Sequence, residues 1–223
     1  MELFPRGNIS GERLSPQTSL PKTFSVCVDT NNYLMYNPSK INGICRGENV
    51  MKLIKPTSEY EQQIRAYRQE FLDEGGSMDG TGALRRMDDP KEWIEWSNAC
   101  MNPVTVPKGL APATQYIFVR ESDLKIVGMI QIRHSFNEYL EKYGGHIGYS
   151  VAPSERRKGY ATQMLDLILP KCRELGLKRI LITCIHDNEG SRRTILNNGG
   201  IYESTVYEAN ENVYLERYWI DIP

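Results

Sequence analysis

The most informative stretch of this chain reads Val151-Ala152-Pro153-Ser154-Glu155-Arg156-Arg157-Lys158-Gly159-Tyr160-Ala161-Thr162. It connects an alternating strand pattern to an amphipathic helical pattern, so three consecutive cations stand directly before a helix. A helix N-terminus presents unpaired backbone N–H groups and a partial positive charge, and a glycine there lets a phosphate approach the backbone closely. The neighbouring basic side chains add charge-assisted hydrogen bonds. The stretch therefore predicts a phosphate site, with a solvated basic turn as the alternative.

The patterns on both sides of this stretch predict an α/β fold with a mixed sheet. Strand patterns occupy residues 51–56, 116–120, 126–133, 146–151, 178–184, 201–207 and 212–222. Helical patterns occupy residues 57–74, 90–100 and 159–175, and a short fourth helix runs from Asn188 to Asn198. The strand before the basic stretch, the helix after it and the next strand form a crossover unit. This unit predicts that strands 146–151 and 178–184 are parallel.

The beginning of the chain differs from the rest. Residues 1–50 contain four prolines and four glycines, and their short apolar groups never settle into a long period. Met51 begins a strand pattern of the kind that often opens an α/β domain. We therefore divide the chain into a loosely structured N-terminal extension, residues 1–50, and one domain, residues 51–223. A chain that starts at Met51 is expected to fold by itself.

Composition argues against several classes of partner. The chain has 27 basic and 28 acidic residues and a formal net charge of -1, so it lacks the overall positive field that favours nucleic acid or an anionic membrane surface. Five cysteines are scattered without a Cys-x-x-Cys pair, and only three histidines accompany them, which argues against a metal site and for a reducing compartment. No apolar run approaches the roughly 18 residues of a membrane span. We expect a cytoplasmic protein with no metal, nucleic acid or membrane partner.

The motif Arg156-x-x-Gly159-x-Ala161, placed between a strand and an amphipathic helix, resembles the pyrophosphate loop of the GNAT superfamily of N-acetyltransferases. The similarity continues through Leu175-Gly176-Leu177, the buried strand that follows, and Asn188-x-x-Ser191 at the start of a short helix. This resemblance implies the GNAT-like acyltransferase fold. In that fold two central parallel strands splay apart, and the pantetheine arm of acetyl-coenzyme A lies between them.

The resemblance, which extends over residues 115–209, also implies which residues bind the cofactor. The loop amides would hold the diphosphate, and the short helix would border the pantetheine. Backbone N–H groups near the end of the first parallel strand would polarise the thioester carbonyl. The residues implied in cofactor binding are Val151, Arg156, Arg157, Lys158, Gly159, Tyr160, Ala161, Asn188 and Ser191.

Acetyl transfer to an amine also requires a base and a place for the acceptor. In the family, the base commonly lies near the start of the strand before the diphosphate loop, and histidine titrates near neutrality, at about pH 6.5 when unperturbed. His146 is therefore the first candidate base and His134 the second, with a structural histidine as the alternative for His146. The candidate substrate-binding residues are Arg133, Asn137 and Tyr149, and the acids Asp79, Asp88 and Asp89 of the loop 75–89 suit a cationic amine.

One departure from the family pattern concerns the general acid. The tyrosine that often protonates the leaving thiolate falls seven residues after the helix-opening asparagine, where this chain has Ile195.

The leading interpretation is an acetyl-coenzyme A dependent N-acetyltransferase that transfers the acetyl group directly to a primary amine of a small molecule or peptide. The alternative is a non-catalytic acyl-coenzyme A sensor of the same fold. The C-terminal strands, with Tyr214, Tyr218 and Trp219, offer an edge for a homodimer.

Overall fold

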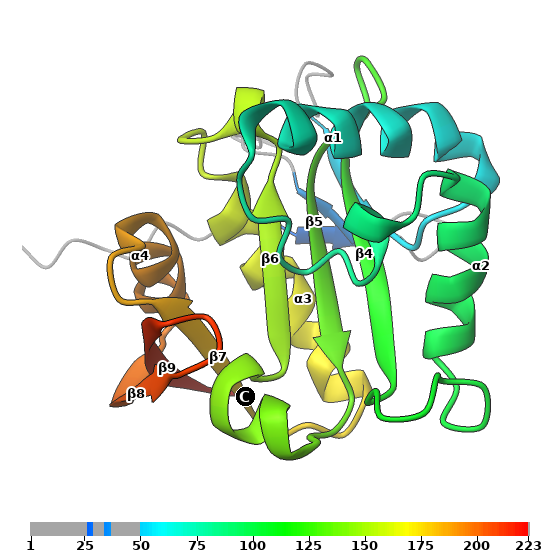
Figure 1. The fold of residues 1–223 in the computed structure, drawn as a ribbon. Helices are drawn as coiled ribbons and strands as arrows, with labels where there is room; N and C mark the ends of the chain where they lie inside the picture. Colours follow the sequence, from blue (N-terminus) through cyan, green and yellow to red (C-terminus); the bar gives the residue numbers. More distant parts are fainter. Residues whose placement is uncertain (1–25, 29–33, 37–49, 223) are drawn as a thin grey trace, which may run out of the picture.

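The computed structural model describes residues 26–28, 34–36 and 50–222, which form a mixed sheet with helices on both faces (Figure 1). Within these residues the sheet has nine strands in the order β1-β2-β3-β4-β5-β6-β7-β9-β8. The pair of β6 and β7 is parallel, whereas the other neighbouring strands pair in the antiparallel sense. The predicted α/β class, with a mixed sheet and a central parallel pair, is confirmed.

The predicted strands and α-helices between residues 51 and 222 differ from the observed ones only at their ends. The structure adds 3-10 turns at Ser58–Tyr60, Leu84–Arg86 and Pro153–Glu155 and a π-helical turn at Leu140–Gly144. The strands are β1 (Val26–Val28), β2 (Leu34–Tyr36), β3 (Met51–Ile54), β4 (Ala113–Arg120), β5 (Lys125–Arg133), β6 (Ile147–Val151), β7 (Arg179–Ile185), β8 (Ile201–Glu208) and β9 (Val213–Asp221). The α-helices are α1 (Glu61–Glu74), α2 (Pro90–Cys100), α3 (Tyr160–Glu174) and α4 (Glu189–Asn197). None of the helices in the described residues is long and apolar enough to cross a membrane.

Local sequence signals explain where the helices on one face begin and end. Asp89 caps α2, because its Oδ1 accepts the backbone N–H of Lys91 at 3.0 Å, and Pro90 occupies the first helical position. Helix α1 ends at Gly75, which adopts the left-handed conformation with φ of 79°. These signals fix the two ends of the loop that crosses the sheet between α1 and α2.

Side-chain alternation along β4 divides the core into two layers. Ile117 and Val119 belong to a buried cluster formed with α1 and α2. Tyr116 and Phe118 point the opposite way and belong to a cluster formed with α3. The sheet therefore has an α1/α2 face and an α3 face (Figure 1). Burying each large apolar side chain in these layers contributes about 1.5–3 kcal/mol.

Strands β6 and β7 form a fork in the middle of the sheet. Their parallel register consists of one pair, Ile147 with Ile182. Beyond that pair β6 continues along β5 while β7 continues along β9, and Figure 1 shows β7 turning away from β6. His146 closes the fork, since its backbone N–H donates to the Leu181 carbonyl at 2.7 Å and its Nδ1 accepts the Leu181 N–H at 2.9 Å.

The predicted N-terminal extension contributes two strands to the sheet. Strands β1 and β2 form an antiparallel pair, and β2 pairs with β3 through Leu34, Met35 and Tyr36. A segment expected to be loose thus contains some regular structure, because β3 offers a free edge of backbone hydrogen-bonding groups to it. The other residues of the range 1–49 lie outside the described part of the chain, and the boundary at residue 50 stays a prediction.

The three aromatic residues of the predicted dimer edge, which lie in the C-terminal hairpin, differ in how exposed their side chains are. Strand β8 is the outer strand of the described sheet, next to β9. Tyr218 is 3% exposed, whereas Tyr214 is 59% exposed. The Trp219 ring is half-buried and lies 3.9 Å from the guanidinium carbon of Arg179. Tyr214 therefore offers the most accessible ring of the three, and the homodimer stays a prediction.

A chain that starts at Met51 tests the predicted domain boundary. The buried clusters of the described residues lie between Met51 and Ile222, so we expect the shortened chain to unfold cooperatively. It should lose the pairing of β2 with β3, or about 1–3 kcal/mol for three cross-strand pairs. It also loses the hydrogen bond that the Glu121 N–H donates to the Val50 carbonyl at 2.9 Å, or about 1 kcal/mol. Thermal unfolding of both chains measures this difference. Absence of a cooperative transition in the shortened chain would show that residues 1–50 are integral to the domain.

Candidate active site

The predicted phosphate loop leaves the start of α3 open. Gly159 precedes the helix in a left-handed conformation with φ of 81°, and no side chain caps the helix. The first N–H groups of an α-helix have no partner within the helix, which here applies to Tyr160, Ala161 and Thr162. A Cβ built on Gly159 would have only the side-chain nitrogen of Gln163 within 4 Å, at 3.9 Å. The backbone at this point is therefore accessible to an anion.

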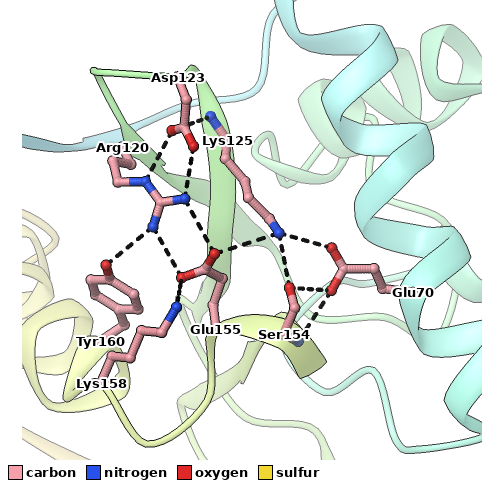
Figure 2. A network of polar contacts seen from close by, with 8 residues as sticks. All are labelled: Glu70, Arg120, Asp123, Lys125, Ser154, Glu155, Lys158 and Tyr160. Atoms are coloured by element: carbon pink, nitrogen blue, oxygen red, sulfur yellow. Dashed lines mark hydrogen bonds and ion pairs between the residues drawn. The ribbon is translucent and has the colours of Figure 1, made fainter.

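The buried carboxylate of Glu155 connects this loop to basic side chains around it (Figure 2). The Glu155 side chain is 6% exposed and accepts hydrogen bonds from Arg120 at 3.0 and 3.2 Å and from Lys158 at 2.7 Å. Lys125 lies 3.5 Å from the same carboxylate. Burial alone would raise the pKa of Glu155, but the hydrogen bonds from Arg120 and Lys158 lower it to about 2. Glu155 is thus the fixed counter-charge of the loop.

The network continues into the hairpin of β4 and β5. Arg120 also binds Asp123 through two hydrogen bonds of 3.0 and 2.8 Å and donates to the Tyr160 hydroxyl at 3.4 Å. Lys125 donates to Ser154 at 2.8 Å, and Figure 2 shows Arg120 and Lys125 reaching from the hairpin to Ser154, Glu155 and Tyr160. Sequence reasoning missed this network. An acid directly before a run of three cations was the available signal, but its partners Arg120 and Lys125 lie 35 and 30 residues earlier in the chain, in β4 and β5.

The three predicted cations of the loop have different surroundings. Arg156 donates to Glu74 of α1 at 2.6 Å, and its guanidinium lies 5.6 Å from the Phe71 ring centroid. Lys158 is paired with Glu155. Arg157 is exposed, adopts φ of 63°, and has no hydrogen bond or ion pair to the described residues. Arg157 is consequently the cation of this loop that is not already matched to a carboxylate.

The far side of the fork is lined by the start of α4. Asn188 caps this helix by accepting the Ser191 N–H at 3.0 Å. The hydroxyl of Tyr149, from β6, lies 2.8 Å from the Ser191 hydroxyl. Burial raises the pKa of Tyr149 and raises the pKa of the nearby Cys184 thiol to about 11. The structure therefore brings Tyr149, Asn188 and Ser191 together and keeps Cys184 protonated at neutral pH.

Each of the two candidate bases already has a hydrogen-bond partner within the protein. His146 accepts the Leu181 N–H with Nδ1, so its neutral ring carries its proton on Nε2. Burial and the charge of Arg133 lower the pKa of His146 to about 4. His134 lies 2.8 Å from the hydroxyl of Thr114, and burial lowers its pKa as well. The base role of both histidines stays a prediction.

Asn137 and Ile195, two further positions singled out in the sequence, have structural contacts. Asn137 accepts the Leu140 N–H at 2.9 Å and donates to the Gly109 carbonyl at 3.0 Å, so both ends of its amide hold loops. Ile195 is fully buried in the α3 cluster, so this position of α4 contributes to packing. In the described part of the chain, no three His, Cys, Asp or Glu side chains are grouped to hold a metal ion.

The family model described as the Acetyltransferase (GNAT) family matches residues 63–199, which is more than half of the chain. The chain belongs to this family. Membership confirms the predicted enzyme class, a GNAT acetyltransferase that uses acetyl-coenzyme A. No curated protein matches the sequence.

Solved structures share the fold of this GNAT acetyltransferase at low sequence identity. The microcin C7 self-immunity acetyltransferase MccE, in complex with acetyl-coenzyme A and AMP, is 18% identical with a TM-score of 0.55, over 77% of this chain and 92% of that one. A ribosomal-protein-S5-alanine acetyltransferase from Vibrio fischeri is 16% identical with a TM-score of 0.57, over 78% and 93%. Mycobacterium smegmatis RimJ, in complex with a coenzyme A disulfide, is 17% identical with a TM-score of 0.58, over 78% and 83%.

Glu155→Gln tests the counter-charge of the loop. The pKa of Glu155 falls from 4.5 to about 2 on folding, which corresponds to about 3 kcal/mol of stability at neutral pH. Because the folded-state pKa is the lower one, this stabilisation is complete above about pH 4.5 and is lost as the pH falls toward about 2. We expect Glu155→Gln to lose this amount at pH 7 and the difference from wild type to shrink in acid. Urea unfolding at several pH values measures both effects.

Glu174→Gln is the matched control for this experiment. Glu174 pairs with Lys171 on the surface of α3, with 63% of its side chain exposed, so its replacement should change stability little. Equal stability of the Glu155→Gln and Glu174→Gln variants at pH 7 would contradict the role assigned to Glu155.

Proposed function

We propose that this GNAT enzyme moves the acetyl group of acetyl-coenzyme A directly to a primary amine of a small molecule or peptide. The observation that carries the proposal is the position of the open α3 N-terminus beside the fork of β6 and β7. The helix end suits the diphosphate of the cofactor. The fork leaves backbone groups of β6 without a strand partner on one side, which suits the amides of an extended pantetheine arm.

The cofactor contacts follow from this placement. The N–H groups of Tyr160 and Ala161 would bind the diphosphate, and Gly159 would let it approach. Arg157 supplies a cation that no carboxylate already occupies, whereas Arg156 and Lys158 support the loop through their acidic partners. Beyond the diphosphate, Val151 of β6 and the start of α4, with Asn188 and Ser191, would border the pantetheine. The thioester then lies near the point where the fork closes.

Proton removal from the amine is the least constrained step. His146 can accept a proton on Nδ1 only after it releases the Leu181 N–H. His134 is bonded to Thr114, which lies on the α3 face of β4 together with Tyr116 and Phe118. An amine that arrives already deprotonated needs neither histidine, and the low pKa of His146, about 4, favours that route.

The amine acceptor is the next part of the proposal. Some similar structures are described as ribosomal-protein acetyltransferases, which supports an amine acceptor but does not distinguish a peptide from a small molecule. The cytoplasmic location, the homodimer, and the lack of nucleic acid and membrane partners stay predictions from the composition and the C-terminal strands.

A thiol-release assay tests the proposed function. The enzyme is mixed with acetyl-coenzyme A and a panel of primary amines that includes amino acids, polyamines, amino sugars and short peptides. Release of free coenzyme A that depends on one class of amine is the expected result. Tight binding of acetyl-coenzyme A, measured by calorimetry, without release in any mixture would contradict transfer to an amine.

Gly159→Glu tests the diphosphate site. A carboxylate at this position would oppose an anion at the N-terminus of α3, so we expect the dissociation constant of acetyl-coenzyme A to rise at least about tenfold. Gly176→Glu is the matched control, because Gly176 follows the other end of α3, also adopts a positive φ of 78°, and has open space around it. Calorimetric titration compares the two variants. Equal affinity in both would place the diphosphate elsewhere.

His146→Ala separates a structural role from a catalytic one. We expect a loss of about 1–3 kcal/mol of stability, because the buried Leu181 N–H loses its acceptor, and an unchanged acidic limb of the pH-rate profile. His146→Asn offers an amide oxygen to the same N–H and should recover part of that stability. Unfolding and pH-dependent turnover are measured on both variants. A base role predicts in addition that turnover falls at least about a hundredfold in both variants and that the acidic limb of the pH-rate profile changes.

A further inference from the structure

Arg133 carries a positive charge that lacks a close carboxylate partner in the described residues. It ends β5, and its Nη1 donates to the carbonyl oxygens of Gly144 at 2.8 Å and Gly145 at 3.2 Å. These bonds fix the guanidinium plane but neutralise none of its charge. Burial lowers the pKa of Arg133, and its charge contributes to the low pKa of His146. A partly buried guanidinium of this kind favours an anion beside it.

The guanidinium lies against β6 at Gly148, the first residue beyond the fork. A Cβ built on Gly148 would lie 3.0 Å from Arg133 Nη2 and 3.0 Å from the backbone nitrogen of Gly80. Gly148 therefore sits between Arg133 and the loop that joins α1 to α2. Arg133 and the buried Gly80 thus pack closely against Gly148, which the lack of a side chain at both glycines allows.

The loop between α1 and α2 is fixed at this point by buried hydrogen bonds. Ser150 donates to the carbonyl of Asp79 at 2.6 Å, and Gln115 donates to the carbonyl of Gly80 at 2.8 Å. Gly80 has φ of 70°, and a Cβ on it would lie 2.0 Å from the Gly148 carbonyl oxygen, so only glycine fits. This fixed backbone holds Asp79 beside β6.

Asp79 supplies the opposite charge at the same place. Its side chain is exposed. Its negative charge partly offsets the effect of burial, which lowers the pKa of Arg133, and adds to the effect of burial, which raises the pKa of Tyr149. It forms no ion pair with Arg133 among the contacts of the described residues. A cation and an anion thus flank Gly148 without neutralising each other, at the position where β6 leaves β7.

We propose that the acceptor is a zwitterion in which a carboxylate neighbours the amine, as in a free amino acid. The carboxylate binds the Nη2 edge of Arg133, and the ammonium faces Asp79. This inference rests on the proposed function and names its substrate class. A peptide N-terminus has an amide in place of the neighbouring carboxylate, so it would leave Arg133 without an anion.

The transfer itself balances without a further reactant. The ammonium loses a proton to water on the Asp79 side, and its nitrogen attacks the thioester carbonyl carbon. The new C–N bond forms, the C–S bond breaks, and the sulfur leaves with the bonding electron pair. The amide nitrogen loses its second proton, and the thiolate takes up one proton to become free coenzyme A.

Matched acceptors test the proposal directly. The wild-type enzyme is assayed by thiol release with the twenty amino acids, their α-amides and the corresponding amines that lack the carboxylate. We expect at least one amino acid to have a kcat/KM about ten- to a hundredfold above its α-amide, the range of one lost charge-assisted hydrogen-bonded contact. A preference for amides, amines or short peptides over every amino acid would overturn the zwitterion but leave the proposed function standing. Failure of all amines would overturn both.

Variants connect the preference to the two charges. Arg133→Gln should raise the KM for the amino acid and remove its advantage over the amide while the affinity for acetyl-coenzyme A stays unchanged. Arg133→Lys retains the charge and serves if the glutamine variant does not fold, with a partial loss of preference expected. Asp79→Asn should raise KM for both acceptors. The matched control is Arg173→Gln, an exposed arginine in the last turn of α3. Unchanged discrimination in both Arg133 variants would overturn the assignment.

Discussion

The opening between β6 and β7 depends on how the sheet divides after the pair of Ile147 and Ile182. Separating two central strands leaves backbone N–H and C=O groups without partners, which is costly in a protein interior. At the closed end of the fork, the backbone N–H of Leu181 has a partner, because the imidazole of His146 accepts its hydrogen bond in place of a main-chain carbonyl. Gly145 allows the close approach that this requires, since a Cβ there would lie 2.5 Å from the Leu181 carbonyl oxygen. The fork is therefore closed at one end by specific residues and open toward α3 and α4.

The loop at the open end has to remain ordered without its anion. Three adjacent cations at a helix N-terminus repel one another and the helix dipole. Glu155 beneath the loop and Glu74 beside it neutralise two of these cations through ion pairs of 2.7 and 2.6 Å. The backbone N–H groups and one arginine are left for a ligand. A nearly neutral protein can in this way present a local anion site that is already in its binding geometry.

The sequence predicted those features that follow from local periodicity. Helix α2 was predicted from Pro90 to about Cys100, as the structure has it, and the strand, helix and strand around the basic stretch predicted a parallel pair that the structure contains. The roles of individual side chains could not be predicted in the same way. Glu155 meets Arg120 across 35 residues, and His146 meets Leu181 across a similar separation. Such contacts depend on how distant strands are aligned, which a pattern in one segment does not encode.

Alternation along β6 explains how two substrates can approach one strand without competing. Tyr149 points to the face packed by α3 and α4, where its hydroxyl contacts Ser191. Gly148 and Ser150 point to the opposite face, where the loop between α1 and α2 is hydrogen-bonded to Ser150. Under the proposed function, a donor held along the open fork and an acceptor bound beside Arg133 would approach β6 from different sides. Under the proposed function, binding sites on separate faces suit direct transfer between two bound molecules. Burial raises the pKa of Cys184 to about 11, which makes this thiol a poor nucleophile for a covalent intermediate.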